Sequence, residues 1–445
     1  MDQQEVISEP KVEQPASVAR GPLPERIGKY EIVKALGKGA AAMVYLARDA
    51  FADRDVALKV IKPEYFKHPE FQRVYRPQFQ VEASLAGKLE HPHIVAIYDA
   101  VLTDDSGHIV MEYVPGGNLA PYVSGKNLLP VDSAVEVAFK CCGALDYAFK
   151  RGIVHRDIKP ANIMVGEGTD IKIGDFGAAY LQHGETTQTL RLGTPSYMSP
   201  EQVEENPLTH HSDMFCLGIV LYELLTGLRP FAARTLPALF KKIVLDDAVL
   251  PSRLTPGLPQ ALDAVVMRAL AKKPGDRYAS WAEFALELAN IGRLRSSQQS
   301  VPDSEKYEAL KKVKMLASLT EPELWALAKA GQWSRAPANQ VIIGEGEESD
   351  RLYFLAKGEA KVTKRGRLLN VIHAGEFFGE MSFISNGSLT RQATVESASD
   401  LLLATFERPA LEQLQARCQL RFLWALLHNV VDRLALADAR LAQTN

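Results

Sequence analysis

The chain has 445 residues, of which 47% are hydrophobic and 24% are charged, and its formal net charge is −3. This composition is typical of a globular protein with about three cores of roughly 150 residues each. The balanced charge gives no reason to expect nucleic acid or an anionic membrane as a partner. No apolar run approaches the roughly 18 residues that cross a bilayer. Four cysteines without metal or disulfide spacing predict reduced thiols and a cytoplasmic location.

The first residues, 1–28, are polar and carry four prolines, so we expect a disordered N-terminal tail. From Tyr30 the apolar residues alternate, and the small residues of 37–42 interrupt the alternation. Two strands around such a turn predict a hairpin whose backbone amides can approach a polyphosphate. A second apolar strand, 56–60, contains one lysine, Lys59, which needs a partner if it is buried.

A loop with three polar side chains follows a predicted helix at 131–150. Residues 154–162 read Val-His-Arg-Asp-Ile-Lys-Pro-Ala-Asn. Pro160 removes a backbone donor and disfavours helix at the preceding residue, so Asp157, Lys159 and Asn162 are expected on a loop that aims them at one ligand. An Ile-Lys-Ile strand then leads to Asp175 in an Asp-Phe-Gly triplet.

These segments resemble, in order, the motifs of serine/threonine protein kinases: the Gly-rich loop, the lysine strand, the catalytic loop and the Asp-Phe-Gly triplet. Ala42 stands where the third glycine of the Gly-rich loop is usual, and Ser199-Pro200-Glu201 stands where Ala-Pro-Glu is usual. The resemblance implies a bilobal kinase domain at 29–291.

The resemblance also implies residue roles. Asp157 would accept or orient the proton of the substrate hydroxyl, Lys59 would hold ATP phosphates and pair with Glu82 in a helix expected at 79–89, and Lys159 favours serine or threonine substrates. Mg²⁺ would be bound by Asn162 and Asp175. The implied ATP-binding residues are Gly37, Lys38, Gly39, Val44, Ala57, Lys59, Met111, Glu112 and Val114.

Three threonines, Thr186, Thr187 and Thr189, lie between Asp175 and Glu201. A phosphate on one of them would add about −1.5 to −2 charge, which could order this segment against an arginine such as Arg156. The alternative is that the threonines only keep the loop soluble. The resemblance further implies that Glu201 pairs with Arg277 and that Asp213 braces the catalytic loop.

After a linker expected at 292–306, a C-terminal domain at 307–445 begins with a short helix and continues with short glycine-bounded strands, which predict a sandwich or barrel. Residues 375–383 and 391–395 resemble the phosphate-binding cassette of cyclic-nucleotide-binding domains. By that resemblance the amides after Gly379 face an anion, Glu380 accepts a ribose hydroxyl and Arg391 grips the cyclic phosphate. Gln392 stands where related domains help sort cyclic AMP from cyclic GMP.

A C-terminal helix is expected over 411–442. Its apolar residues alternate at four- and three-residue spacing, which is typical of a coiled-coil seam and of a homodimer. The alternative is a helix that folds over its own β-roll as a lid. The seam residues are Leu423, Leu427, Val430, Leu434, Ala437 and Leu441.

We therefore expect an α+β protein in which a bilobal kinase fold precedes a β-roll cyclic-nucleotide-binding domain with a C-terminal helix. The expected function is phosphorylation of serine or threonine in a protein substrate, with ATP and Mg²⁺ as cofactors. Cyclic AMP or cyclic GMP is the expected effector. The alternative function keeps the kinase and makes the C-terminal domain a ligand-free dimerisation or docking module.

Overall fold

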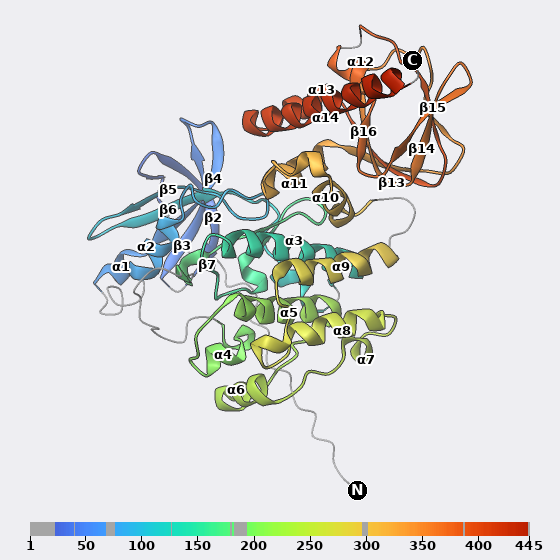
Figure 1. Ribbon diagram of the computed structural model, residues 1–445. Coiled ribbons are helices and arrows are strands. Elements are labelled where there is room, and N and C mark those ends of the chain that lie inside the picture. Colours follow the sequence, from blue (N-terminus) through green and yellow to red (C-terminus); the bar gives the residue numbers. More distant parts are fainter. Residues whose placement is uncertain are drawn as a thin grey trace. The chain divides into compact units, whose positions relative to one another are not determined.

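The computed structural model describes residues 23–39, 41–67, 76–125, 127–178, 180–181, 194–295, 301–385 and 388–443 (Figure 1). The chain divides into two compact units. Unit 1 comprises Met1–Lys88 and Ala96–Val114, and unit 2 comprises Leu89–Val95 and Pro115–Asn445. Residues 1–22 of the tail predicted at 1–28, and the predicted phosphorylation sites Thr186, Thr187 and Thr189, lie outside the described residues. The end of the predicted tail is ordered, because Arg26–Ile27 form a strand that pairs with Tyr30 and Glu31.

Unit 1 is built on a six-stranded antiparallel sheet in the order β1-β2-β3-β4-β6-β5. The central strand β4 buries Val56, Ala57 and Leu58, as its unbroken apolar run predicts. Helix α2 ends at Ser84, before the predicted end at residue 89, because the Ser84 hydroxyl bonds the Val81 carbonyl and Gly87 adopts a φ of 68°. The elements are β1 (Arg26–Ile27), β2 (Tyr30–Lys38), β3 (Ala42–Asp49), β4 (Arg54–Ile61), α1 (Pro63–Phe66), α2 (Arg76–Ser84), β5 (Ile97–Leu102) and β6 (Gly107–Glu112).

The first part of unit 2 is mainly helical. Helices α3 and α5 are buried along most of their length, and α3 covers nearly the whole predicted helix. Helix α5 begins after the capping residue Thr209 and ends at Gly227, whose φ of 72° stops the helix. The elements are α3 (Val131–Phe149), β7 (Ile153–Val154), β8 (Ile163–Val165), β9 (Ile171–Ile173), β10 (Tyr180–Leu181), α4 (Pro200–Val203), α5 (His210–Thr226), α6 (Leu236–Leu245), α7 (Pro251–Leu254), α8 (Gln260–Ala269) and α9 (Trp281–Arg295), with 3-10 turns η2 (Ala120–Tyr122), η3 (Pro160–Asn162), η4 (Phe176–Ala178), η5 (Pro195–Tyr197) and η6 (Pro274–Asp276).

Helices α10 and α11 precede the C-terminal strands, with a 3-10 turn between them. Within the expected linker, residues 292–295 continue α9 and residues 303–306 already belong to α10, while 296–300 lie outside the described residues. Figure 1 shows α10 beside α3 and α9, with which it makes direct contacts. The bounds are α10 (Asp303–Lys311), η7 (Lys314–Leu316) and α11 (Glu321–Ala330).

The C-terminal strands form two four-stranded antiparallel sheets, which confirms the predicted β-roll. The sheet orders are β11-β18-β13-β16 and β12-β17-β14-β15. Among the described residues, none of the helices is long and apolar enough to span a membrane. The elements are β11 (Gln332–Ala336), β12 (Val341–Ile343), β13 (Leu352–Lys357), β14 (Glu359–Lys364), β15 (Arg367–His373), β16 (Glu376–Phe378), α12 (Glu380–Ile384), β17 (Thr394–Ser397), β18 (Leu401–Phe406), α13 (Arg408–Glu412) and α14 (Ala416–Gln443).

The C-terminal helix expected over 411–442 is in fact two helices, α13 and α14. The Gln419 side chain donates hydrogen bonds to the carbonyls of Glu412 and Leu414, at 2.8 and 2.6 Å. A continuous helix would use these carbonyls for its own backbone amides, so the side chain stabilises the break.

Candidate functional site

Adjacent strands of unit 1 gather the predicted ATP-binding side chains on one face of the sheet. Val44 on β3 lies opposite Lys59 on β4, and Met111 on β6 lies opposite Ala57 on β4. Ala57 and Lys59 are two residues apart, so their side chains point to the same face, and directly opposed residues share that face. At the turn before this face, Gly37 pairs with Val44. The sequence alone predicted the strands. Their register shows in addition that Val44, Ala57, Lys59 and Met111 share one face of the sheet.

The Lys59 ammonium and the Glu82 carboxylate form an ion pair with 2.7 Å between Nζ and Oε2. Glu82 is 3% exposed, so its charge lies in the interior of unit 1 and needs this partner. The structure therefore brings together the strand lysine and the helix glutamate that the sequence analysis matched.

The predicted adenine contacts are backbone groups of Glu112, the last residue of β6, and of Val114 just after it. The Glu112 amide donates a hydrogen bond to the Ala96 carbonyl at 2.8 Å. Because this bond occupies the Glu112 amide, Val114 is the one of these two residues whose amide would donate to adenine.

In unit 2 the loop at 154–162 holds an aspartate between a lysine and an amide. Asp157 Oδ2 lies 2.6 Å from Lys159 Nζ and accepts a hydrogen bond from Asn162 Nδ2 at 3.0 Å. Asn162 Nδ2 also donates to the Asp157 carbonyl at 2.8 Å. The chain is extended at Lys159 and turns at η3, which starts with Pro160 as its ring predicts. The three polar residues are thus oriented toward one another.

Asp213 on α5 fixes the backbone of this loop. Its two carboxylate oxygens accept hydrogen bonds from the amides of His155 and Arg156, each at 2.8 Å. Arg156 has a φ of 67°, an unfavourable conformation for a side chain with a Cβ, so the loop needs such support. Burial raises the pKa of the Asp213 carboxyl, although these amides favour its charged form.

The two predicted metal ligands are tied together through the backbone. The Gly174 amide donates to the Asn162 carbonyl at 2.9 Å, and His155 Nε2 donates to the Gly174 carbonyl at 3.0 Å. Asp175, the next residue, is exposed. The Asn162 amide nitrogen is engaged by Asp157, so its amide oxygen is the atom that can bind a cation. A carboxylate and an amide oxygen are ligands that suit Mg²⁺.

Glu201 on α4 and Arg277 form a buried bidentate pair, as the sequence analysis predicted. The Nη1 to Oε1 distance is 2.6 Å and the Nη2 to Oε2 distance is 2.9 Å. The arginine side chain has no exposed surface. The pair joins two segments that are 76 residues apart in the chain.

In the β-roll, Arg391 lies buried beside Gly379. Its Nη1 donates to the Gly379 carbonyl at 2.9 Å, and its Nη2 donates to Ser349 Oγ at 3.0 Å and to the Arg351 carbonyl at 2.7 Å. A Cβ at position 379, where φ is 80°, would lie 2.6 Å from Nη1, so only glycine fits. Sequence reasoning missed Ser349 and Arg351, since no motif marks them.

Arg391 also has an unused donor. Its Nε is buried and has no hydrogen-bond partner among the described residues, and burial lowers the pKa of its guanidinium. An anion at this position would supply the missing acceptor, so the site fits a phosphate. Glu380 is half-buried at the start of α12 and follows Gly379 directly in the chain. Gln392 is exposed, and its side chain donates a hydrogen bond to the Thr390 carbonyl at 2.9 Å.

Helix α14 has two apolar faces. Phe422 packs against the rings of Phe377 and Phe406, with ring centroids 5.7 and 6.2 Å apart, so one face covers the roll. The seam residues Leu423 and Leu427 are about half exposed. The side chains of Leu434, Ala437 and Leu441 lie outside the described part of the chain.

Comparison with known proteins agrees with this geometry. The protein kinase domain family matches residues 30–285, and the cyclic nucleotide-binding domain family matches residues 333–418. The chain is 39% identical over 275 residues to serine/threonine-protein kinase PknB of Mycobacterium leprae, covering 60% of this chain and 44% of the relative. It is 36% identical over 283 residues to serine/threonine-protein kinase PrkC of Bacillus subtilis, covering 62% of this chain and 43% of the relative. The chain thus spans less than half the length of these relatives. Because the kinase match covers more than half of it, the chain belongs to the protein kinase family.

Proposed function

We propose that the chain is an ATP-dependent protein serine/threonine kinase with Mg²⁺ as its cofactor. The observation that carries the proposal is the Asp157 carboxylate, which Lys159 and Asn162 hold on a loop fixed by Asp213. The names of the relatives, all serine/threonine-protein kinases, support the same substrate class.

The proposed roles follow from this geometry. Asp157 orients the substrate hydroxyl and takes its proton while the hydroxyl oxygen bonds to the γ-phosphorus and the bond to the β-phosphate oxygen breaks, which releases ADP. Lys159 keeps the Asp157 carboxylate in place and adds positive charge beside the transferred group. Lys59, positioned by Glu82, binds phosphate oxygens. Mg²⁺, when held by Asn162 and Asp175, neutralises phosphate charge.

Phosphotransfer tests this proposal. The full chain is incubated with Mg²⁺-ATP and a generic protein substrate, and phosphoserine and phosphothreonine are measured. Asp157→Asn is expected to lower the rate by at least about 10²-fold, because the general base is lost. Asp276→Asn, a neutralisation on the exposed turn η6, is the control and is expected to keep the wild-type rate. An inactive wild type, or an equally active Asp157→Asn, would overturn the proposal.

We also propose that a cyclic nucleotide binds at Arg391 and regulates the kinase. The buried Nε without a partner and the family match at 333–418 support this site. A ligand that binds only the folded state raises the melting temperature. The melting temperature is measured with cyclic AMP and with cyclic GMP, and we expect at least one of them to raise that of the wild type. Arg391→Lys is expected to abolish this rise in melting temperature, and Arg367→Ala is expected to keep it. No shift with either nucleotide would favour the alternative, a ligand-free dimerisation or docking module.

The exposed face of α14 supports a homodimer with a second copy of the chain. Leu423, Trp424, Leu427 and Val431 are each about half exposed on this helix. Four such residues at helical spacing are typical of a coiled-coil seam. Sedimentation is expected to show a dimer in the wild type and a monomer in Leu427→Asp, with Arg417→Asp as the exposed control on the same helix. A monomeric wild type at all concentrations would contradict this proposal.

Three further features stay predictions. The domain organisation 1–28, 29–291, 292–306 and 307–445 is supported by family matches that fall within the second and fourth ranges. Phosphorylation at Thr186, Thr187 or Thr189 can be sought by mass spectrometry after incubation with ATP. Full activity with alanine at all three positions would exclude an activating role for this phosphorylation. A cytoplasmic location is supported by the four buried free thiols.

A further inference from the structure

Two helices of unit 2 that belong to neither family match pack against that part of unit 2 which the kinase match covers. The kinase match ends at residue 285 and the cyclic nucleotide-binding match begins at residue 333. Residues 303–330, which comprise α10, η7 and α11, fall between them. We call this segment the helical bridge.

The helical bridge supplies partners to two buried charges on α3. Lys140 has no exposed side-chain surface, and its Nζ lies 2.7 Å from Asp303 Oδ2. One turn earlier, the Glu136 carboxylate accepts hydrogen bonds from the amide and the hydroxyl of Ser304, each at 2.8 Å. Buried charges without partners are strongly destabilising, so the first turn of α10 is part of the interior of this unit.

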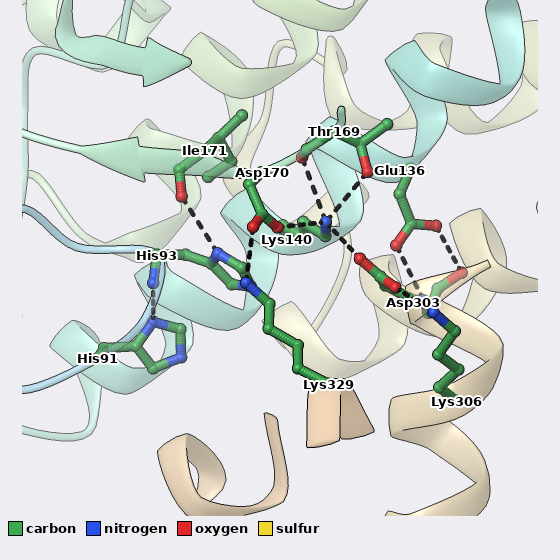
Figure 2. Close-up of polar contacts among 11 residues, drawn as sticks. His91, His93, Glu136, Lys140, Thr169, Asp170, Ile171, Asp303, Lys306 and Lys329 are labelled. Carbon is green, nitrogen blue, oxygen red and sulfur yellow. Dashed lines mark hydrogen bonds and ion pairs between the residues drawn. The ribbon is translucent and has the colours of Figure 1, made fainter. Parts of the chain in front are cut away.

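The same lysine holds the loop that precedes β9. Lys140 Nζ donates to the Thr169 carbonyl at 3.2 Å and lies 3.0 Å from Asp170 Oδ1. The other carboxylate oxygen of Asp170, Oδ2, lies 2.7 Å from Nζ of Lys329 on α11. Asp170 is therefore held by Lys140 on α3 and by Lys329 of the helical bridge (Figure 2).

A second contact reaches β9 through His93. The Trp325 ring on α11 packs edge-on against the His93 ring, with centroids 4.8 Å apart. His93 Nδ1 donates to the Ile171 carbonyl at 3.1 Å, and the His93 carbonyl accepts from the Ile173 amide at 2.9 Å. Burial lowers the pKa of the His93 ring.

Strand β9 ends two residues before Asp175. Any displacement of Ile173 moves Gly174, whose amide and carbonyl bond Asn162 and His155. The position of β9 therefore decides where the predicted metal ligand lies. An error of about 1 Å at such a group can cost roughly 10²-fold in rate.

We propose that Lys329 and Trp325 of the helical bridge are positioning residues for Asp175, which they hold through Asp170, His93 and β9. This proposal rests on the proposed kinase function only in the role of Asp175. The helical bridge lies outside the kinase family match, and the proposal gives it a role in positioning a kinase residue.

The proposal predicts a local change when Lys329 is altered. Hydrogen–deuterium exchange of the peptide 169–176 in Lys329→Ala is expected to be faster than in the wild type by about two- to five-fold, as for loss of one partly exposed ion pair. Lys329→Arg is expected to restore wild-type exchange, and Trp325→Leu to exceed Lys329→Ala. The matched control is Arg335→Ala, which removes another 2.7 Å ion pair of this region, with Glu305, and does not touch Asp170.

Activity supplies a second readout. The Mg²⁺ concentration for half-maximal phosphotransfer is expected to rise in Lys329→Ala by about the same two- to five-fold and to return in Lys329→Arg. Unchanged exchange in Lys329→Ala, or equal acceleration in Arg335→Ala, would overturn the positioning role. If exchange responds as expected but the wild type transfers no phosphate, the positioning role stands and the proposed kinase function fails.

Discussion

Glu323 on α11 and Arg421 on α14 form an ion pair with 2.8 Å between Oε2 and Nη1. The same carboxylate accepts hydrogen bonds from the Thr320 amide and hydroxyl at 2.6 and 2.8 Å, so it also caps the N-terminus of α11. Since Phe422, the next residue on α14, packs on the aromatic core of the roll, α14 joins the roll to the helical bridge.

This pair predicts where regulation can be uncoupled. In Arg421→Ala the effect of cyclic nucleotide on kinase activity is expected to shrink, because α14 loses its ion pair with α11. Allosteric coupling is ordinarily about 1–3 kcal/mol, or roughly 5- to 150-fold, so a loss is measurable as the ratio of rates with and without nucleotide. The affinity of Arg421→Ala for the nucleotide is expected to stay within about two-fold of the wild-type affinity.

The control for this variant is Arg417→Ala, an exposed arginine one turn earlier on α14. It is expected to keep the wild-type ratio of rates. Full regulation in Arg421→Ala would show that the signal does not pass through the Glu323 pair.

Asp303 is expected to contribute to stability through Lys140. Burial raises the pKa of Asp303, but the charges and hydrogen bonds of Lys140 and Lys306 outweigh burial and lower this pKa from 3.8 to about 2. This contribution is present above pH 3.8 and is lost as the pH falls toward 2, and the shift corresponds to about 2 kcal/mol. Asp303→Asn is expected to lower the free energy of unfolding by about 2–4 kcal/mol at pH 7, measured with urea.

Glu359→Gln is the control, because its pair with His373 is exposed. Its effect is expected to stay below about 1 kcal/mol. Equal effects of the two substitutions would mean that Lys140 finds other partners when Asp303 is neutralised.

Glu321 predicts a different dependence on pH. Burial and the nearby charge of Asp146, partly offset by Lys150 and Lys311, raise the pKa of Glu321 from 4.5 to about 7. The folded state therefore binds a proton that the unfolded state has lost, and stability falls as the pH rises from 4.5 through 7. The shift corresponds to at most about 3 kcal/mol.

The melting temperature of the wild type is thus expected to fall between pH 6 and pH 8. Glu321→Gln is expected to remove this part of the dependence, because the amide resembles the neutral carboxyl. Asp276→Asn, on an exposed turn, is expected to follow the wild type. Parallel curves for Glu321→Gln and the wild type would contradict the assigned pKa.

Arg277→Ala is expected to destabilise the protein more than loss of an exposed ion pair. Glu201 would remain 4% exposed without its bidentate partner. An uncompensated buried charge costs about 3–5 kcal/mol, measured as a loss in the free energy of unfolding. Arg268→Ala, whose pair with Glu283 is more than one-third exposed, is expected to cost about 1 kcal/mol or less. A small effect of Arg277→Ala would show that water reaches Glu201.

The local geometry of the loop at 154–162 could be predicted from the sequence because the decisive constraints are local. Pro160 sets the turn that orients Asp157 and Asn162, and an apolar strand sets the place of Lys59. Pairs such as Glu201 and Arg277 were within reach only because the order of motifs resembles a known family. Composition and periodicity alone do not pair residues that are 76 positions apart.

A short helix was predicted in the helical bridge, but the contacts of the bridge were outside the reach of sequence reasoning. Lys140 stands between Phe139 and Cys141 on a buried helix, which signals a buried cation but does not name its partner. Asp303 lies in a polar stretch that composition classifies as linker. The roles of Ser349 and Arg351 beside Arg391 were missed for the same reason, since contacts across a roll depend on its register.

The distance in sequence between Lys140 and Asp303 has a consequence for synthesis on the ribosome. The two residues are 163 positions apart. At about 5–20 residues per second, Lys140 would be made roughly 8 to 30 s before its carboxylate partner. During that interval Lys140 can bond Thr169 and Asp170 but not Asp303, so this part of the interior around α3 is completed only after α10 has been made.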